Sequence, residues 1–144
     1  MKVLIDTSVI VAALVNSHPE HRRSVAWLQK VINKQILGFM SSHSLLETYS
    51  VLTSLPLSPK VSPELALELI KKNLLDNFNI ITYEKKDYLE LIETLSKNNI
   101  SGGASYDGLI LIAAEKIELD KIITLNINDF IRISPALIDK ISAP

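Results

Sequence analysis

Short apolar runs that suit buried strands alternate with longer segments of helical periodicity along this chain. The first run is Val3-Leu4-Ile5, and further candidates are residues 36–40, 80–83, 122–125 and 130–133. Strands that alternate with helices favour a parallel sheet, because a parallel connection needs a crossover that is usually a helix. The sequence therefore predicts the α/β class, with a central parallel sheet of four to five strands flanked by helices on both faces.

The expected helices carry apolar residues at helical spacing, which marks the side that faces the core. Residues 109–114 are apolar almost all the way round, so the helix that contains them should be largely buried. Three other helices have narrower stripes, which we expect to be buried: Leu45, Tyr49 and Leu52; Leu65, Leu69 and Leu74; and Leu89, Ile92 and Leu95.

Length and composition fit one globular domain that spans residues 1–144. Hydrophobic residues make up 47% and charged residues 22%, which is the balance of a folded rather than a disordered chain. Cysteine is absent, so disulfides and thiolate metal sites are excluded. The net charge of −1 argues against a protein that coats nucleic acid, but not against a nuclease with an acidic site.

Nothing in the chain indicates a membrane segment or a secretion signal. No apolar run approaches the roughly 18–20 residues that a membrane-spanning helix needs. Asp6 interrupts the N-terminal apolar run early, which does not suit a signal peptide. We therefore expect a cytoplasmic protein without membrane contact.

Three acidic residues are candidates for a functional site. Asp6 follows the first strand, where functional groups gather in open parallel sheets, and a carboxylate there must be hydrogen-bonded, capping a helix or binding a cation. Glu47 lies across its helix from the expected stripe, and Asp107 lies in the first turn of the apolar helix. Taken singly, each has an ordinary explanation: a helix cap, a solvated side chain and a favourable interaction with a helix dipole.

Taken in order, the segments that hold these acids resemble the PIN-domain family, in particular its VapC-type toxin ribonucleases. The matching segments are Asp6-Thr7-Ser8, SxxxLLETYSVL around Glu47, SYDGLILIAAEK around Asp107, and TLNINDF from Thr124, so that the likeness runs from Lys2 to Phe130. The resemblance implies that Asp6, Glu47 and Asp107 are the catalytic and metal-site residues, with Thr7, Ser8 and Thr124 in support. Where the family often has a fourth acid this chain has Asn126, which leaves open whether Asn126 or Asp129 fills that position.

The resemblance also implies an activity and partners. The expected function is a metal-dependent endoribonuclease that hydrolyses RNA phosphodiester bonds, as the toxin of a type II, VapBC-like pair. Oxygen ligands suit Mg²⁺ or Mn²⁺, which neutralise phosphate charge and lower the pKa of water. The implied partners are an RNA substrate, an antitoxin protein and a second copy of the chain in a homodimer. The RNA that is cleaved and the class of antitoxin are left open.

Other functions stay open or fit poorly. A non-toxin PIN protein in RNA processing, or a catalytically silent RNA- or protein-binding PIN module, remain alternatives. A receiver domain fits poorly, because that class needs adjacent acids after the first strand. His18, His21 and His43 show no zinc-binding or catalytic pattern, so we expect surface histidines.

Overall fold

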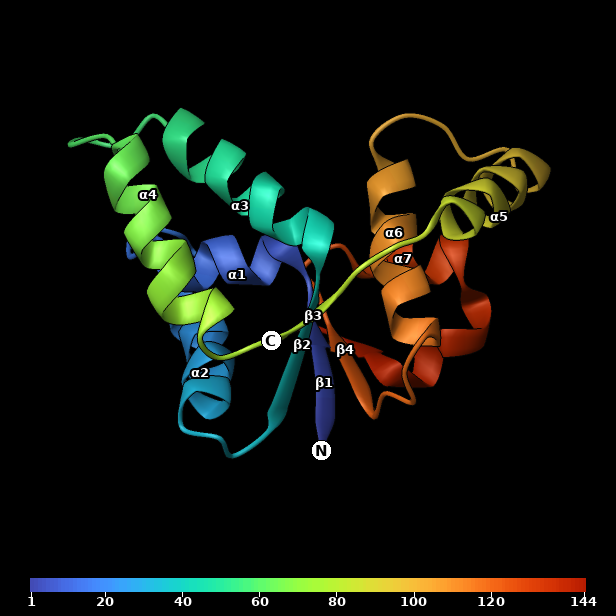
Figure 1. The fold of residues 1–144 in the computed structure, drawn as a ribbon, viewed down its shortest axis with the longest axis horizontal. Coiled ribbons are helices and arrows are strands. Elements are labelled where there is room, and N and C mark those ends of the chain that lie inside the picture. The colour runs from blue at the N-terminus through green and yellow to red at the C-terminus, as the bar shows by residue number, and fades with distance from the viewer.

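A central sheet separates two groups of helices (Figure 1) in the computed structural model, which describes residues 1–144. The strand order is β3-β2-β1-β4-β5 and every pairing is parallel, which confirms the predicted α/β class and a sheet of five strands. The strands are β1 (Lys2–Ile5), β2 (Leu37–Ser41), β3 (Asn79–Ile81), β4 (Lys121–Ile123) and β5 (Ile141–Ser142).

Helices α1 to α4 lie on one side of the sheet and α5 to α7 on the other (Figure 1). None of them combines the length and the apolar character needed to cross a membrane. The helices are α1 (Thr7–Leu14), α2 (His21–Ile32), α3 (Ser42–Ser54), α4 (Pro63–Ile70) with a π-helical continuation (Lys71–Leu75), α5 (Lys85–Lys97), α6 (Ala104–Glu115), α7 (Ile127–Ile133) and a 3₁₀ helix (Pro135–Lys140).

Strand β1 contributes to a separate apolar core on each face of the sheet. Val3 and Ile5 pack into the core under α1 and α2, whereas Leu4 packs into the core under α5, α6 and α7. The division follows from the strand, because successive side chains point to opposite faces. Both faces are therefore buried, as is usual for a parallel sheet, and only the ends of the strands remain open for a site.

The expected fifth strand at residues 130–133 is wrong, because this segment belongs to helix α7. Phe130 and Ile133 are both buried, and their spacing of three puts them on one side of a helix. A short apolar run has no periodicity that distinguishes a strand from one turn of a buried helix. The fifth strand is instead β5, close to the C-terminus.

The expected stripe of α5 is wrong for two of its three residues. Leu89 and Ile92 are 55% and 61% exposed. The buried side of α5 is formed by Asp87, Leu91 and Leu95, which are spaced four residues apart. One of the inward-facing positions of α5 is occupied by the carboxylate of Asp87. A prediction based on apolar residues alone therefore selects the wrong side of this helix.

In α3 and α4, too, the buried side differs from the expected one. Tyr49 of α3 and Leu65 of α4 are exposed, although both belong to expected stripes. Small or polar residues take some of the inward-facing positions in these helices, and α3 packs against both α1 and α4. The buried residues are Ser44, Thr48 and Leu52 in α3, and Ala66 and Ile70 in α4.

Candidate active site

An open pocket of about 300 Å³ lies at the carboxyl ends of β1 and β4, and all three predicted acids line it. Asp6 follows β1 directly, Glu47 comes from α3, and Asp107 comes from the first turn of α6. Helices α3 and α6 lie on opposite sides of the sheet (Figure 1), and each contributes an acid to this one pocket. The pocket is also lined by Thr7, Ser8 and Asn126.

Asp6 is buried and does not act as a helix cap. It occupies the residue before α1, but its side chain makes no capping hydrogen bond. Instead, Oδ2 accepts hydrogen bonds from Ser8 Oγ (2.5 Å) and Thr124 Oγ1 (2.8 Å). Burial raises the pKa of Asp6, these two donors oppose the rise, and the charge of Glu47 adds to it. Asp6 is thus a buried carboxylate held by neutral donors, with no cationic side chain bound to it.

Glu47 is half-buried and is oriented by its neighbours. Thr7 Oγ1 lies 3.1 Å from Glu47 Oε2 and 2.8 Å from Ser44 Oγ. Because a carboxylate only accepts, the Thr7 hydroxyl donates to Glu47, and Ser44 can donate to Thr7. On the outer side, His43 Nε2 lies 3.5 Å from Glu47 Oε2, which is an ion pair whenever the imidazole is protonated.

The pKa of Asp107 shows that the carboxylates of the site repel one another. Its pKa is raised to about 7, mainly by burial and further by the negative charges of Asp6, Asp129 and Glu47, while Arg132 partly opposes the rise. Groups that hinder each other's ionisation in this way share one electrostatic environment. A bound cation would relieve that repulsion.

The uncertain fourth position involves Asn126 and Asp129. Thr124 Oγ1 accepts a hydrogen bond from the Asn126 N–H (2.9 Å), so this turn is tied to the hydroxyl that holds Asp6. Asn126 lines the pocket. Asp129 is not among the lining residues and pairs with Arg132 at 3.4 Å, although its charge reaches Asp107. Both residues therefore stay candidates, Asn126 by position and Asp129 by charge.

The donor set suits a hard divalent cation in hydrated form. The acids offer only oxygen ligands, which Mg²⁺ and Mn²⁺ prefer. As the side chains stand, no three acidic or histidine side chains converge closely enough to enclose an ion. Mg²⁺ commonly keeps several waters and uses one or two carboxylates plus substrate phosphates, and the pocket leaves room for such an arrangement. The residues thus fit a hydrated ion and do not form a closed protein cage.

Several residues beside the site were not predicted from the sequence. His18 lines the pocket and its Nδ1 accepts a hydrogen bond from the Glu20 N–H. His43 and Ser44 both approach the group around Glu47. Their spacing was a usable signal, because residues three or four positions before Glu47 on a helix share its side. His18 had no such signal, since its place depends on the turn after α1.

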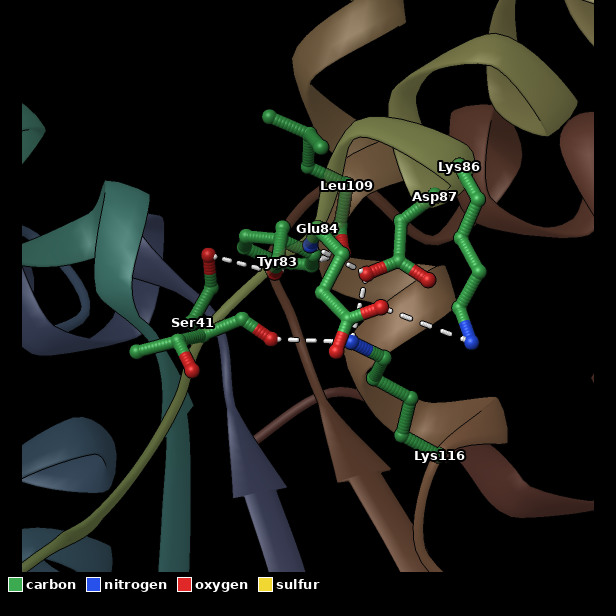
Figure 2. Close-up of polar contacts among 8 residues, drawn as sticks. Ser41, Tyr83, Glu84, Lys86, Asp87, Leu109 and Lys116 are labelled. Carbon is green, nitrogen blue, oxygen red and sulfur yellow. Dashed lines mark hydrogen bonds and ion pairs between the residues drawn. The ribbon is translucent and has the colours of Figure 1, made fainter.

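A second polar network joins the ends of β2 and β3 to α5 and α6 (Figure 2). Tyr83 points toward Ser41 on one side and Leu109 on the other, while Lys116 Nζ donates to both the Asp87 carboxylate and the Thr82 carbonyl. Asp87 also accepts the Glu84 N–H, which starts α5. Lys116 and Asp87 thereby fix the start of α5 against the end of α6.

The sequence of this chain is similar to a family model and to curated proteins. The sequence model of the PIN-domain family matches residues 3–134 of this chain. Ribonuclease VapC40 of Mycobacterium tuberculosis is 30% identical over 110 residues, which cover 76% of this chain and 76% of that protein. Ribonuclease VapC27 of the same organism is 33% identical over 110 residues, or 76% of this chain and 74% of that protein.

Solved structures agree with the fold. VapBC2 from Rickettsia felis, bound to a DNA fragment from its promoter, has a TM-score of 0.61 at 25% identity, covering 93% of this chain and 94% of that one. FitAcB from Neisseria gonorrhoeae has a TM-score of 0.65 at 21% identity, covering 91% and 92%, and at this identity it bears on the fold alone. The chain therefore belongs to the PIN-domain family, and its curated relatives there are VapC-type ribonucleases.

Proposed function

We propose that this protein is a metal-dependent endoribonuclease that hydrolyses RNA phosphodiester bonds, with Asp6, Glu47 and Asp107 as its catalytic and metal-site residues. One observation carries the proposal: three carboxylates from separate elements line one pocket at the strand ends, and the pKa of Asp107 is raised to about 7 there. The curated relatives named ribonuclease support the same activity. We expect the protein to act in the cytoplasm, where cellular RNA is found.

Each residue of the site has a distinct task in this proposal. When bound, Mg²⁺ or Mn²⁺ supplies charge neutralisation for the phosphate and lowers the pKa of water. Asp6 provides a fixed oxygen, because Ser8 and Thr124 hold its Oδ2 from two sides. Glu47 is held by a hydrogen bond from Thr7. The half-buried Asp107 completes the negative field that attracts the cation.

The activity is tested by incubating the purified protein with single-stranded RNA in Mg²⁺, in Mn²⁺ and in a chelator. Asp6→Asn should keep the fold and reduce metal-dependent cleavage by orders of magnitude. The matched control is Asp139→Asn, since Asp139 is exposed and lies outside the pocket. Undiminished turnover by Asp6→Asn would overturn the site assignment, and RNA binding without cleavage by the wild type would favour a silent PIN module.

We further propose that the protein is the toxin of a type II pair and is restrained by an antitoxin. Solved relatives of the same fold include the VapBC2 complex of Rickettsia felis. The physical requirement for restraint is a cation, because an Arg or Lys side chain that enters the pocket would satisfy the carboxylates in place of metal or phosphate. The exposed Leu65, together with Leu55, Leu57 and Leu69, is a candidate surface for docking the rest of the partner, although the latter three also pack against the core of α3 and α4.

The partner proposal is tested on the cognate protein, which we expect to be encoded beside this chain. The wild-type partner should inhibit RNA cleavage. Replacement of its pocket-entering Arg by Ala should abolish inhibition while binding is retained. Full inhibition by the Arg-less partner would show that restraint works in another way, and a chain without any partner would favour a role in RNA processing.

A homodimer is the third part of the proposal. Twofold symmetry is the commonest closed arrangement of identical chains. The exposed Leu89 and Ile92 of α5 offer apolar area for such a contact. Light scattering measures the mass in solution, and an Ile92→Lys variant should convert a dimer through α5 to a monomer. A monomeric wild-type protein would contradict the dimer, and a dimer unaffected by Ile92→Lys would move the contact away from α5.

A further inference from the structure

Two aromatic side chains form a parallel stack at the edge of the acidic site. The rings of His43 and Tyr106 have centroids 4.9 Å apart and planes within 1° of each other. They come from α3 and α6, the two helices that carry Glu47 and Asp107. His43 lies one turn before Glu47 and 3.5 Å from its carboxylate, and Tyr106 directly precedes Asp107.

Tyr106 is an exposed aromatic residue and is not part of the apolar core. The residue is 55% exposed. His43 stacks on one side of the ring in an offset arrangement, and more than half of the Tyr106 surface remains exposed. A flat aromatic surface that is already held parallel to another ring, and still open on its outer side, is suited to receive a third flat group.

The flat group that RNA offers for such a stack is an unpaired base. Proteins that bind single-stranded RNA stack unpaired bases on aromatic or histidine rings, and stacking does not depend on positive charge. This matters for a chain with a net charge of −1, which lacks a broad positive field to hold the RNA backbone. A base close to a phosphate in the acidic pocket can reach Tyr106, because the His43 ring stacked on Tyr106 lies 3.5 Å from Glu47, which lines that pocket.

We propose that the His43–Tyr106 pair is a stacking platform for one unpaired nucleobase next to the scissile phosphate. The inference rests on the proposed ribonuclease function and adds to it a residue pair that holds one unpaired base, since a paired base is already stacked within its helix. The outer face of Tyr106 contacts the base, and His43 supports the ring from behind.

Three variants test the platform on a short single-stranded RNA. Tyr106→Leu should lower kcat/KM roughly tenfold, the size expected for loss of one stacked base, whereas Tyr106→Phe should stay near the wild type because it keeps the ring. The matched control is Tyr88→Leu, which removes an exposed tyrosine of α5 outside the pocket and should leave cleavage unchanged. Melting temperatures of all variants show whether each protein is folded.

Abasic substitution locates the base. RNAs that lack one base at a time near the cleavage point should lose activity with the wild type at one position, and Tyr106→Leu should be insensitive at that same position. An equal cost of every abasic site in both proteins would overturn the platform, as would a Tyr106→Leu variant with normal kcat/KM. A Tyr106→Phe variant as weak as Tyr106→Leu would overturn it too, because the hydroxyl rather than the ring would then be at work.

Binding measurements separate this inference from the proposed activity. The Asp6→Asn protein should bind an RNA that carries the fluorescent base 2-aminopurine, with quenching that Tyr106→Leu removes. If the wild type cleaves RNA but no position shows coupling to Tyr106, the platform fails and the ribonuclease proposal stands. If the wild type cleaves nothing but the quenching depends on Tyr106, the platform stands and the nuclease proposal fails.

Discussion

Tyr83 Oη lies 2.7 Å from the carbonyl oxygen of Leu109 and equally close to Ser41 Oγ. A phenol has one proton and a carbonyl only accepts, so Tyr83 donates to Leu109 and Ser41 donates to Tyr83. Ser41 Oγ in turn accepts the His43 N–H at the start of α3. One chain of hydrogen bonds therefore runs from the helix of Glu47 to the helix of Asp107, and Figure 2 shows its part from Ser41 through Tyr83 to Leu109.

Tyr83→Phe should destabilise the protein by about 1–3 kcal/mol, because it leaves the fully buried Ser41 hydroxyl without its acceptor. Burial raises the pKa of Tyr83 to about 12, so the hydroxyl remains a neutral donor at ordinary pH. Urea unfolding measures the change, with Tyr88→Phe as the exposed control. An unfolding midpoint equal to that of the wild type would show that the chain of hydrogen bonds contributes nothing net.

The Asp87–Lys116 pair should make stability depend on acid pH. The hydrogen bond from Lys116 lowers the pKa of the buried Asp87, and the Glu84 N–H lowers it further. A carboxyl whose pKa is lower in the folded state stabilises above its unfolded pKa of about 3.9 and loses that contribution as pH falls through the folded value. The stability gap between wild type and Asp87→Asn should be full at neutral pH and shrink below about pH 4.

Urea midpoints from pH 3 to 8 check this dependence, with Asp139→Asn as the control for loss of a surface carboxylate. Lys116→Met should be more damaging than Asp87→Asn at neutral pH, because it leaves a buried carboxylate without its cation. A gap that is independent of pH would mean that the pair does not perturb Asp87.

Metal should stabilise the folded protein. Mg²⁺ or Mn²⁺ binds the assembled site but not the unfolded chain, so the melting temperature should rise by a few degrees as the ion saturates the site. Asp107→Asn removes one of the repelling carboxylates, and should raise the melting temperature of the metal-free protein slightly while it reduces the response to metal. Thermal melts with and without each ion measure both effects. A melting temperature indifferent to millimolar Mg²⁺ and Mn²⁺ would contradict a shared site.

Two close-packed glycines should respond differently to alanine. A Cβ at Gly38 in β2 would lie 2.5 and 2.7 Å from the two methyl groups of Val31, and a β-branched side chain cannot turn both away. Gly38→Ala should therefore cost about 1–3 kcal/mol. At Gly108 in α6 the nearest atom is a single Leu91 methyl at 2.5 Å, and the gain in helix propensity of about 1 kcal/mol offsets the crowding.

Chemical unfolding of both variants checks this difference, with Gly103→Ala as the control because a Cβ there meets nothing within 4 Å. If Gly108→Ala proved more damaging than Gly38→Ala, the contact between α5 and α6 would be less adaptable than the packing of Val31 on β2.

The sequence determined the class of fold because local patterns carry it. The run Val3-Leu4-Ile5 followed by Asp6 predicts a buried strand with a polar residue at its open end, and the structure has both features. The apolar segment at residues 109–114 predicts a buried helix for the same reason. These features depend on neighbours a few residues apart, so a single chain is enough to recognise them.

The tertiary structure decided which side of each helix faces inward and how the acids meet. Asp87 occupies a core position only because Lys116 is there to neutralise it, and no apolar pattern reveals such a pair. Phe130 to Ile133 belong to a helix, and the place beside β4 is taken by β5, a pairing between segments that no local pattern reveals. The pKa of Asp107 is likewise raised mainly by burial and further by the charges of Asp6, Asp129 and Glu47, and both causes exist only after folding. Electrostatic and packing energies depend on the distances between groups in space. Groups far apart in the sequence come close only once the sheet has brought the strand ends together.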